Sequence, residues 1–127
     1  MTLDEILADA HIDRDIDFIS IDVEGHEYEA LEGFSLEKWK PSIMLIEDNS
    51  NFENNIVSTY LRRHGYVRFM RTGVNDWYAH RTNSQFVTMR SRIGMMWLMV
   101  RSRAKTRLRR IPLIMKIRAL LSAPGGR

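Results

Sequence analysis

Two short apolar segments most constrain the fold of this chain. Residues 17–22 are Asp-Phe-Ile-Ser-Ile-Asp, and residues 42–46 are Ser-Ile-Met-Leu-Ile. Both are rich in β-branched or other apolar residues and are bounded by polar residues or proline, which predicts two strands. In the first segment Phe18, Ile19 and Ile21 place apolar side chains on both faces, as is typical of a parallel strand covered on both sides.

A predicted helix lies between these two strands. It follows Gly25, extends from His26 to about Leu31, and precedes Gly33, which is placed to end it in the left-handed conformation. A strand–helix–strand unit of this kind predicts two parallel strands with a right-handed crossover. The chain is therefore expected to adopt an α/β fold.

Further helices and strands are expected on either side of this unit. Thr2-Leu3-Asp4-Glu5 predicts a capping box at the start of a first helix, with apolar side chains at positions 3, 6 and 7 on one side. A helix from about Glu53 to His64, with Ile56, Tyr60 and Leu61 inward, is closed by Gly65. Residues 66–70 and 77–80 then predict two strands around a turn that contains Gly73 and Asp76, and hence an antiparallel hairpin at one edge of the sheet.

The charges are distributed very unevenly along the sequence. Residues 1–60 hold 15 acids and 3 bases, whereas residues 90–127 hold 11 bases and no acid, so the net charge of +3 hides an acidic first half and a basic end. We therefore divide the chain into a domain at residues 1–83 and a basic tail at residues 84–127.

The absence of cysteine excludes disulfides and cysteine-ligated zinc or iron–sulfur sites.

The tail has the pattern of an amphipathic helix. Its apolar residues recur at steps of three or four and are Phe86, Met89, Ile93, Met96, Trp97, Val100, Ala104, Leu108 and Ile111. Pro112 is expected to break the helix, and a second short helix is expected at residues 113–121. The alternatives for residues 86–121 are a helix docked on its own domain, an anionic membrane surface, or a protein partner. A nucleic acid is disfavoured, because aromatic residues do not interleave with the bases.

Three sequence motifs together resemble a known family. They are residues 2–7 (Thr-Leu-Asp-Glu-Ile-Leu), residues 16–33 with Asp-Val-Glu-Gly at positions 22–25, and residues 41–47 (Pro-Ser-Ile-Met-Leu-Ile-Glu). Over roughly residues 2–80 the chain resembles the C-terminal half of the FkbM family of S-adenosylmethionine-dependent methyltransferases. The resemblance implies a partial class I methyltransferase sheet, Rossmann-like, with parallel strands and a terminal antiparallel hairpin.

The resemblance also implies that part of the family's domain is missing. The strands here would be the fourth to seventh of seven, and none of the seven glycines forms a Gly-x-Gly turn after a strand. The cofactor-binding residues are therefore not identified. The chain is expected to be a fragment, a degenerate product or one part of a split protein, and to be inactive alone.

The predicted site lies where the first two strands end. Ligands of doubly wound sheets bind beyond the carboxyl ends of the strands, and acids follow both strands here. We expect Asp22 and Glu24 to be the catalytic acids, with His26 as a further proton acceptor. The other interpretation is structural: Asp22 as a helix cap, Glu24 as a residue that favours the helix dipole, and His26 as a solvated side chain.

A metal site is a further expectation. Asp22, Asp48 and Asn49 resemble the metal-binding residues of catechol O-methyltransferase-like enzymes, so a divalent cation such as Mg²⁺ is expected there. Those enzymes carry a lysine base three residues after the first acid, where this chain has Gly25.

The resemblance implies a reaction and a class of acceptor. The reaction is methyl transfer from S-adenosylmethionine to a hydroxyl group of a small molecule or glycan, such as a sugar or secondary metabolite. The alternative is a non-enzymatic protein that binds anionic membranes or a partner through its tail. Acids at the N-terminus do not fit a signal peptide, so a cytoplasmic protein, peripheral at the membrane, is expected.

Overall fold

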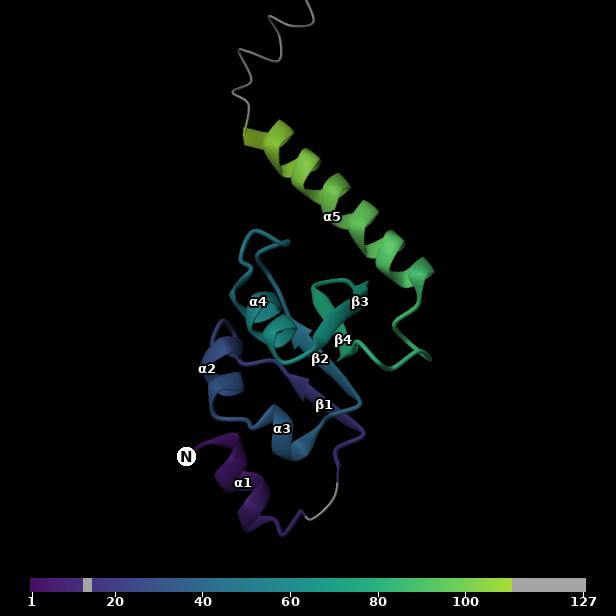
Figure 1. Cartoon of the computed structure of the whole chain (residues 1–127). Helices are drawn as coiled ribbons and strands as arrows, with labels where there is room; N and C mark the ends of the chain where they lie inside the picture. Colours follow the sequence, from purple (N-terminus) through teal and green to yellow (C-terminus); the bar gives the residue numbers. More distant parts are fainter. Residues whose placement is uncertain (13–14, 111–127) are drawn as a thin grey trace, which may run out of the picture.

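The computed structural model describes residues 1–12 and 15–110, which form a small α/β body and one long helix (Figure 1). The helices are α1 (Leu3–Asp9), α2 (Glu27–Glu32), α3 (Leu36–Trp39), α4 (Ile56–Arg63) and α5 (Met89–Arg110). The strands are β1 (Phe18–Ile21), β2 (Ile43–Glu47), β3 (Tyr66–Thr72) and β4 (Asn75–His80). The predicted order is present, with one addition, the short helix α3.

The strands form one mixed sheet in the order β1-β2-β4-β3. β1 and β2 are parallel, with Phe18 opposite Ile43 and Ile21 opposite Ile46. β4 lies between β2 and β3 and is antiparallel to both. The predicted parallel pair and the hairpin at one edge are therefore confirmed. The parallel pairing brings the carboxyl ends of β1 and β2 side by side.

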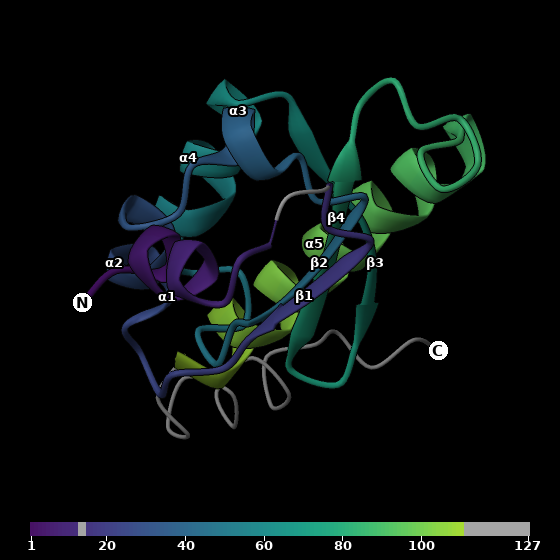
Figure 2. The ribbon, with the colours of Figure 1, turned by 90° about the horizontal axis from the view of Figure 1, so that it is seen from below.

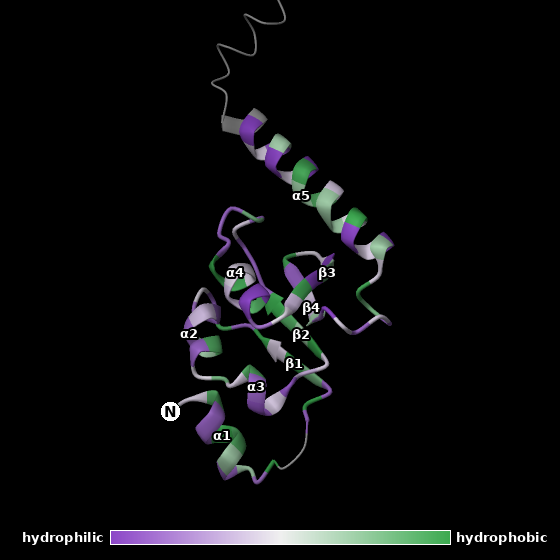
Figure 3. Ribbon diagram, in the orientation of Figure 1, coloured by the Kyte–Doolittle hydropathy of each residue, from purple (hydrophilic) through white to green (hydrophobic). Residues whose placement is uncertain are grey.

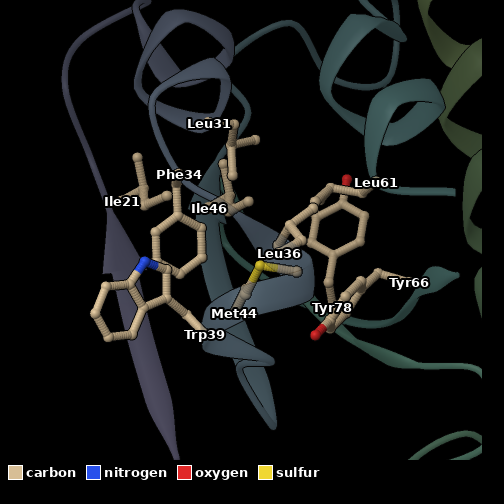
Figure 4. Packing of buried hydrophobic residues seen from close by; sticks show 10 residues of the cluster. All are labelled: Ile21, Leu31, Phe34, Leu36, Trp39, Met44, Ile46, Leu61, Tyr66 and Tyr78. Carbon is tan, nitrogen blue, oxygen red and sulfur yellow. The ribbon is translucent and has the colours of Figure 1, made fainter. Parts of the chain in front are cut away.

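The hydrophobic core lies between the sheet and helices α1 to α4, which gather on one side of it (Figure 2). Its buried residues, which Figure 4 shows in contact, are Ile21, Leu31, Phe34, Leu36, Trp39, Met44, Ile46, Leu61, Tyr66 and Tyr78. Side chains alternate between the two faces of a strand, so Met44 and Ile46 point toward the helices and Leu45 points away.

The other face of the sheet is less covered by the residues that the structure describes. Phe18 of β1 is 49% exposed, and its ring centroid lies 6.2 Å from that of Trp77 on β4. β1 is an edge strand, and no strand of the described ranges pairs with its outer side. The prediction that this strand is covered on both faces is wrong for the described residues, because α1 to α4 lie on the opposite face.

The first helix is fixed by its cap and by one carboxylate. The predicted capping box is confirmed, since Thr2 Oγ1 accepts from the Glu5 N–H and Glu5 Oε2 accepts from the Thr2 N–H. Asp4 Oδ1 accepts from the Ser35 N–H at 2.8 Å and from Trp39 Nε1 at 2.7 Å. These two bonds join α1 to α3 and hold the Trp39 ring in the core.

Several predicted details of the helices are wrong. Gly33 has φ −89° and not a left-handed conformation. A Cβ at Gly33 would lie 3.0 Å from the Thr2 Cβ, so the glycine permits the close approach of the segment that begins α1. α4 begins at Ile56 rather than near Glu53, and Ile56, expected inward, is 54% exposed.

The hairpin is longer than predicted. β3 reaches Thr72 and β4 begins at Asn75, so the turn consists of Gly73, with φ +63°, and Val74. Asp76, expected in the turn, belongs to β4 and is 1% exposed. A buried aspartate needs partners, which the neighbouring strand provides.

Helix α5 packs against β3, and its residue Met95 is 5% exposed. The predicted apolar stripe lies on a different side of the helix from Met95 and is largely exposed. Figure 3 shows hydrophobic and hydrophilic residues mixed along α5. None of the described helices is both long and apolar enough to cross a membrane. Ile111, Pro112 and the predicted second helix lie outside the described residues.

Candidate functional site

A cavity of about 200 Å³ lies beyond the carboxyl end of β2. It is bounded by the turn after β1, the loop after β2, helix α4 and the hairpin. Its lining residues are Gly25, Glu27, Ile46, Glu47, Asp48, Asn49, Ser50, Asn54, Val57, Ser58, Arg68, Asp76 and Tyr78. Of the acids expected to meet at this edge of the sheet, Glu47 and Asp48 line the cavity, whereas Asp22 and Glu24 do not. Glu27, which was not among them, also lines it.

The turn after β1 carries the predicted catalytic residues. Glu24 and Gly25 both have positive φ, 49° and 100°, and the His26 N–H donates to the Val23 carbonyl at 3.3 Å. Two central residues with positive φ are the pattern of a type I′ turn. Left-handed backbone is unfavourable for glutamate, and residues held in such conformations often cluster at functional sites.

Asp22, Glu24 and His26 are exposed and do not line the cavity. His26 is the N-cap residue of α2, and its side chain makes no capping hydrogen bond. The side chain of Asp22 makes no hydrogen bond or ion pair with any residue that the structure describes. The three predicted catalytic side chains therefore lie on one turn beside the cavity, open to solvent.

Glu27 is the acid of this turn that faces the cavity. It begins α2, is only 9% exposed, and its Oε1 accepts from the Gly25 N–H at 2.9 Å. This bond fixes both the turn and the carboxylate. The sequence places Glu27 where the helix dipole favours an anion, but its position near a helix start does not distinguish a cavity residue from a surface residue.

Asp48 organises the loop that follows β2. Its Oδ1 accepts from the N–H and the hydroxyl of Ser50, and its Oδ2 accepts from the Phe52 N–H at 3.1 Å. Asn51 and Phe52 have φ of 53° and 69°, so these bonds hold two consecutive residues in the left-handed region. Burial raises the pKa of Asp48, but hydrogen bonds from Ser50 and Arg71 outweigh it and leave the pKa below its ordinary value.

Two arginines and Asp76 extend this arrangement into the hairpin. Arg71 lies 3.0 Å from Asp48 Oδ2 and 2.9 Å from Asp76 Oδ1. Arg68 Nε lies 2.9 Å from Asp76 Oδ2. The ring of Phe52 stacks under both guanidinium groups, with its centroid 4.8 Å from Arg68 Cζ and 4.2 Å from Arg71 Cζ. We call these four charged side chains, at positions 48, 68, 71 and 76, the ion network.

Burial acts strongly on two further groups beside the cavity. It raises the pKa of Asp76 to about 6, although Arg68 and Arg71 oppose the change. It also raises the pKa of Tyr78 to about 12, so this hydroxyl stays protonated at neutral pH. Tyr78 Oη accepts from Arg68 Nη2 at 2.9 Å, which adds a neutral partner to the ion network.

The described residues do not fit the predicted metal site. Among residues 1–12 and 15–110, no three His, Asp or Glu side chains gather where they could hold a metal ion. Asp48 is occupied by Ser50, Phe52 and Arg71, whereas Asn49 is exposed and Asp22 does not line the cavity. A magnesium ion at Asp22, Asp48 and Asn49 would require Asp48 to give up these bonds.

Sequence reasoning missed Glu27 and the two arginines of the ion network. A signal was available for Arg68, because it lies between apolar residues in the strand predicted at residues 66–70, and Arg71 directly follows that segment. A charged side chain in a strand beside a core calls for a buried partner of opposite charge. The only acid in residues 61–89 is Asp76.

The comparison with protein families gives one match. The Methyltransferase FkbM domain matches residues 1–68, just over half of the chain, from α1 into β3. Neither the comparison with curated proteins nor that with solved structures gives a match. The matched segment contains the turn after β1, the loop after β2 and most of the cavity wall. The chain therefore belongs to the Methyltransferase FkbM domain family.

Proposed function

We propose that this chain takes part in methyl transfer from S-adenosylmethionine to a hydroxyl oxygen of a small-molecule or glycan acceptor. Methyltransferases of this kind generally use S-adenosylmethionine, and membership of the family is the observation that carries the proposal. The acid-bearing turn after β1 supports it, because it lies at the edge of the sheet where α/β proteins bind ligands.

The turn after β1 supplies a group that can accept a proton. An acceptor hydroxyl that becomes methylated must lose its proton, and a carboxylate or a neutral imidazole can take it. Asp22, Glu24 and His26 are exposed on this turn and remain the candidates for that role. Glu27 is already an acceptor for the Gly25 N–H, so we assign it the role of fixing the turn.

The described residues do not fit a whole cofactor by themselves. The cavity of about 200 Å³ is smaller than the roughly 300–1,000 Å³ of small-molecule and cofactor sites. No glycine-rich turn follows a strand in this sequence, so the backbone lacks the usual place of close approach to a cofactor. We therefore propose that this chain contributes the acceptor side of the site, and that a further polypeptide segment contributes the cofactor side.

The outer edge of β1 is the place for such a segment. No described strand pairs with it, and the half-exposed Phe18 beside it offers apolar surface. An added strand would satisfy the free backbone groups of β1, and elements next to it would cover Phe18. Such an addition would also extend the crevice beyond the carboxyl end of β1.

Two measurements test the proposed function. Calorimetry on the purified 127-residue chain should show no micromolar binding of S-adenosylmethionine. Fused behind the cofactor-binding half of an active FkbM methyltransferase, the full chain should restore transfer of radiolabelled methyl groups to hydroxylated acceptors. Micromolar binding by the chain alone would contradict the proposal that a further segment contributes the cofactor side of the site. A folded but inactive fusion would contradict the methyltransferase role.

A further inference from the structure

Among the residues that the structure describes, helix α5 attaches to the body by one of its sides. Met95 is 5% exposed, and Met99 Sδ lies 3.9 Å from Arg68 Nη1. Farther along, Ser102 donates to Asn51 Oδ1 at 2.7 Å, in the loop after β2. These positions recur at steps of three or four and define one side of the helix. This side holds α5 against the hairpin and the loop of the cavity.

The opposite side of α5 carries a row of exposed apolar residues, which we call the outer stripe. It consists of Met89, Ile93, Met96, Trp97 and Val100, which are 70%, 47%, 53%, 67% and 57% exposed. Single exposed apolar residues are ordinary, but five on one side of a helix are not. The stripe was predicted from the sequence; the structure adds that it is not the side that docks.

Basic residues flank the outer stripe on both sides. Residues 89–110 contain eight arginine or lysine residues and no acid. At 100° per residue, Arg90 and Arg101 border the stripe on one side, Arg92 and Arg103 border it on the other, and Arg107 continues its line. An exposed tryptophan, flexible methionines and bordering arginines are the pattern of a helix that lies in a membrane interface.

We propose that the outer stripe of α5 docks the protein onto an anionic membrane surface, with α5 lying parallel to it. This inference is independent of the proposed function. A second copy of the chain is a poor occupant, because pairing two stripes would bring two strongly basic helices together. Anionic lipid headgroups match the bordering bases, and the apolar stripe enters the boundary between headgroups and acyl chains.

The central experiment measures binding of the full chain to vesicles. Vesicles of phosphatidylcholine with phosphatidylserine should bind the chain, and vesicles of phosphatidylcholine alone should bind it much less. Binding should weaken as salt rises, because the bordering charges are screened. Trp77, which is only partly buried, is first replaced by phenylalanine. Tryptophan emission should then shift to the blue on binding, and Trp97→Phe should remove most of that shift, since Trp39 is already buried. No binding to the anionic vesicles at low salt would overturn the proposal.

Matched variants separate the stripe from simple charge attraction. Arg101→Gln with Arg103→Gln should weaken binding about thirtyfold, from about 1 kcal/mol for each base near the surface. Arg62→Gln with Arg63→Gln removes the same charge from the exposed end of α4 and should change binding by less than about threefold. Equal effects of the two pairs would overturn the proposed surface.

The apolar part of the stripe needs its own variant. Trp97→Ser should weaken binding at least tenfold while leaving the fold unchanged, because Trp97 is 67% exposed. Circular dichroism and thermal unfolding check the fold of every variant. If Trp97→Ser binds vesicles as well as the parent chain, or if the chain prefers duplex DNA or an acidic protein to the vesicles, the membrane proposal is wrong.

Discussion

The two parallel strands end in acids that have very different surroundings. At the end of β2, Asp48 accepts hydrogen bonds from Ser50 and Phe52 and pairs with Arg71. At the end of β1, Asp22 is exposed and has no hydrogen-bond partner among the residues that the structure describes. An acid whose oxygens are already used shapes the protein, whereas an acid with free oxygens is available to a substrate. This contrast separates a structural aspartate from a candidate catalytic one.

The largest expected effect is on turnover. In the active fusion described above, Asp22→Asn should lower the rate of methyl transfer by roughly two to four orders of magnitude. Asparagine keeps the shape of the side chain but cannot accept the proton of a hydroxyl. The free energy of unfolding should change by less than about 0.5 kcal/mol, because the side chain is exposed.

The matched variants for this test are Glu24→Gln and His26→Gln on the same turn. If Asp22→Asn keeps near-normal turnover and one of these two variants loses it, the catalytic role moves to that residue. If none of the three lowers turnover, the turn after β1 has no catalytic part. Radiolabel transfer under saturating S-adenosylmethionine gives the rate in each case.

Replacing Asp48, in contrast to Asp22, should strongly lower the free energy of unfolding. Asp48→Ala leaves Arg71 short of one carboxylate and removes the acceptors of the loop N–H groups, so we expect a loss of about 3–5 kcal/mol in the free energy of unfolding. Urea denaturation followed by circular dichroism measures it. Asp22→Ala is the control and should cost less than about 0.5 kcal/mol. Equal losses would show that the contrast between the two strand ends has no energetic basis.

The loss of stability on replacing Glu27 should fall between the losses for Asp22 and Asp48. Glu27→Ala removes the acceptor of the Gly25 N–H and should cost about 1–2 kcal/mol in unfolding free energy. Glu27→Gln keeps an oxygen in the same place and should restore most of that loss. In the fusion, both stability and turnover should recover with glutamine if Glu27 only fixes the turn. Turnover that stays low in a stable Glu27→Gln variant would make Glu27 a catalytic residue instead.

The sequence predicted the parallel pair, the hairpin and the capping box because each depends on local patterns. The β-branched segments, the strand–helix–strand order and Thr2 with Glu5 are all visible within a few neighbouring positions. The ion network is not local, since Asp48 and Arg71 are 23 positions apart. Glu27 was not identified as a cavity residue, because a helix start gives no sign of which side chain turns inward. The side by which α5 docks also depends on tertiary contacts, so the apolar stripe alone did not identify it.

The smallest expected effect is a pH dependence at the buried end of the ion network. Burial raises the pKa of Asp76 from 3.8 to about 6 in the folded protein. The folded state therefore binds a proton more tightly than the unfolded state, so ionised Asp76 lowers stability above pH 6, and this cost is relieved as the pH falls from 6 toward 4. The pKa of Asp48 is lowered instead, so its stabilisation is present above about pH 4 and is lost only below that.

The free energy of unfolding should accordingly rise by about 1 kcal/mol as the pH falls from 7.5 to 5. Urea denaturation measures it. The matched variant is Asp76→Asn, which should remove this rise in the free energy of unfolding. Where the variant is too unstable to compare, the carbon-13 shift of the Asp76 carboxyl in the parent chain reports its titration directly. A midpoint below 4 would mean that Arg68 and Arg71 outweigh burial. The pKa of Asp76 would then be held low by its arginine partners, as that of Asp48 is. Only the exposed acids of the turn after β1 would then differ in their surroundings from the acids of the ion network.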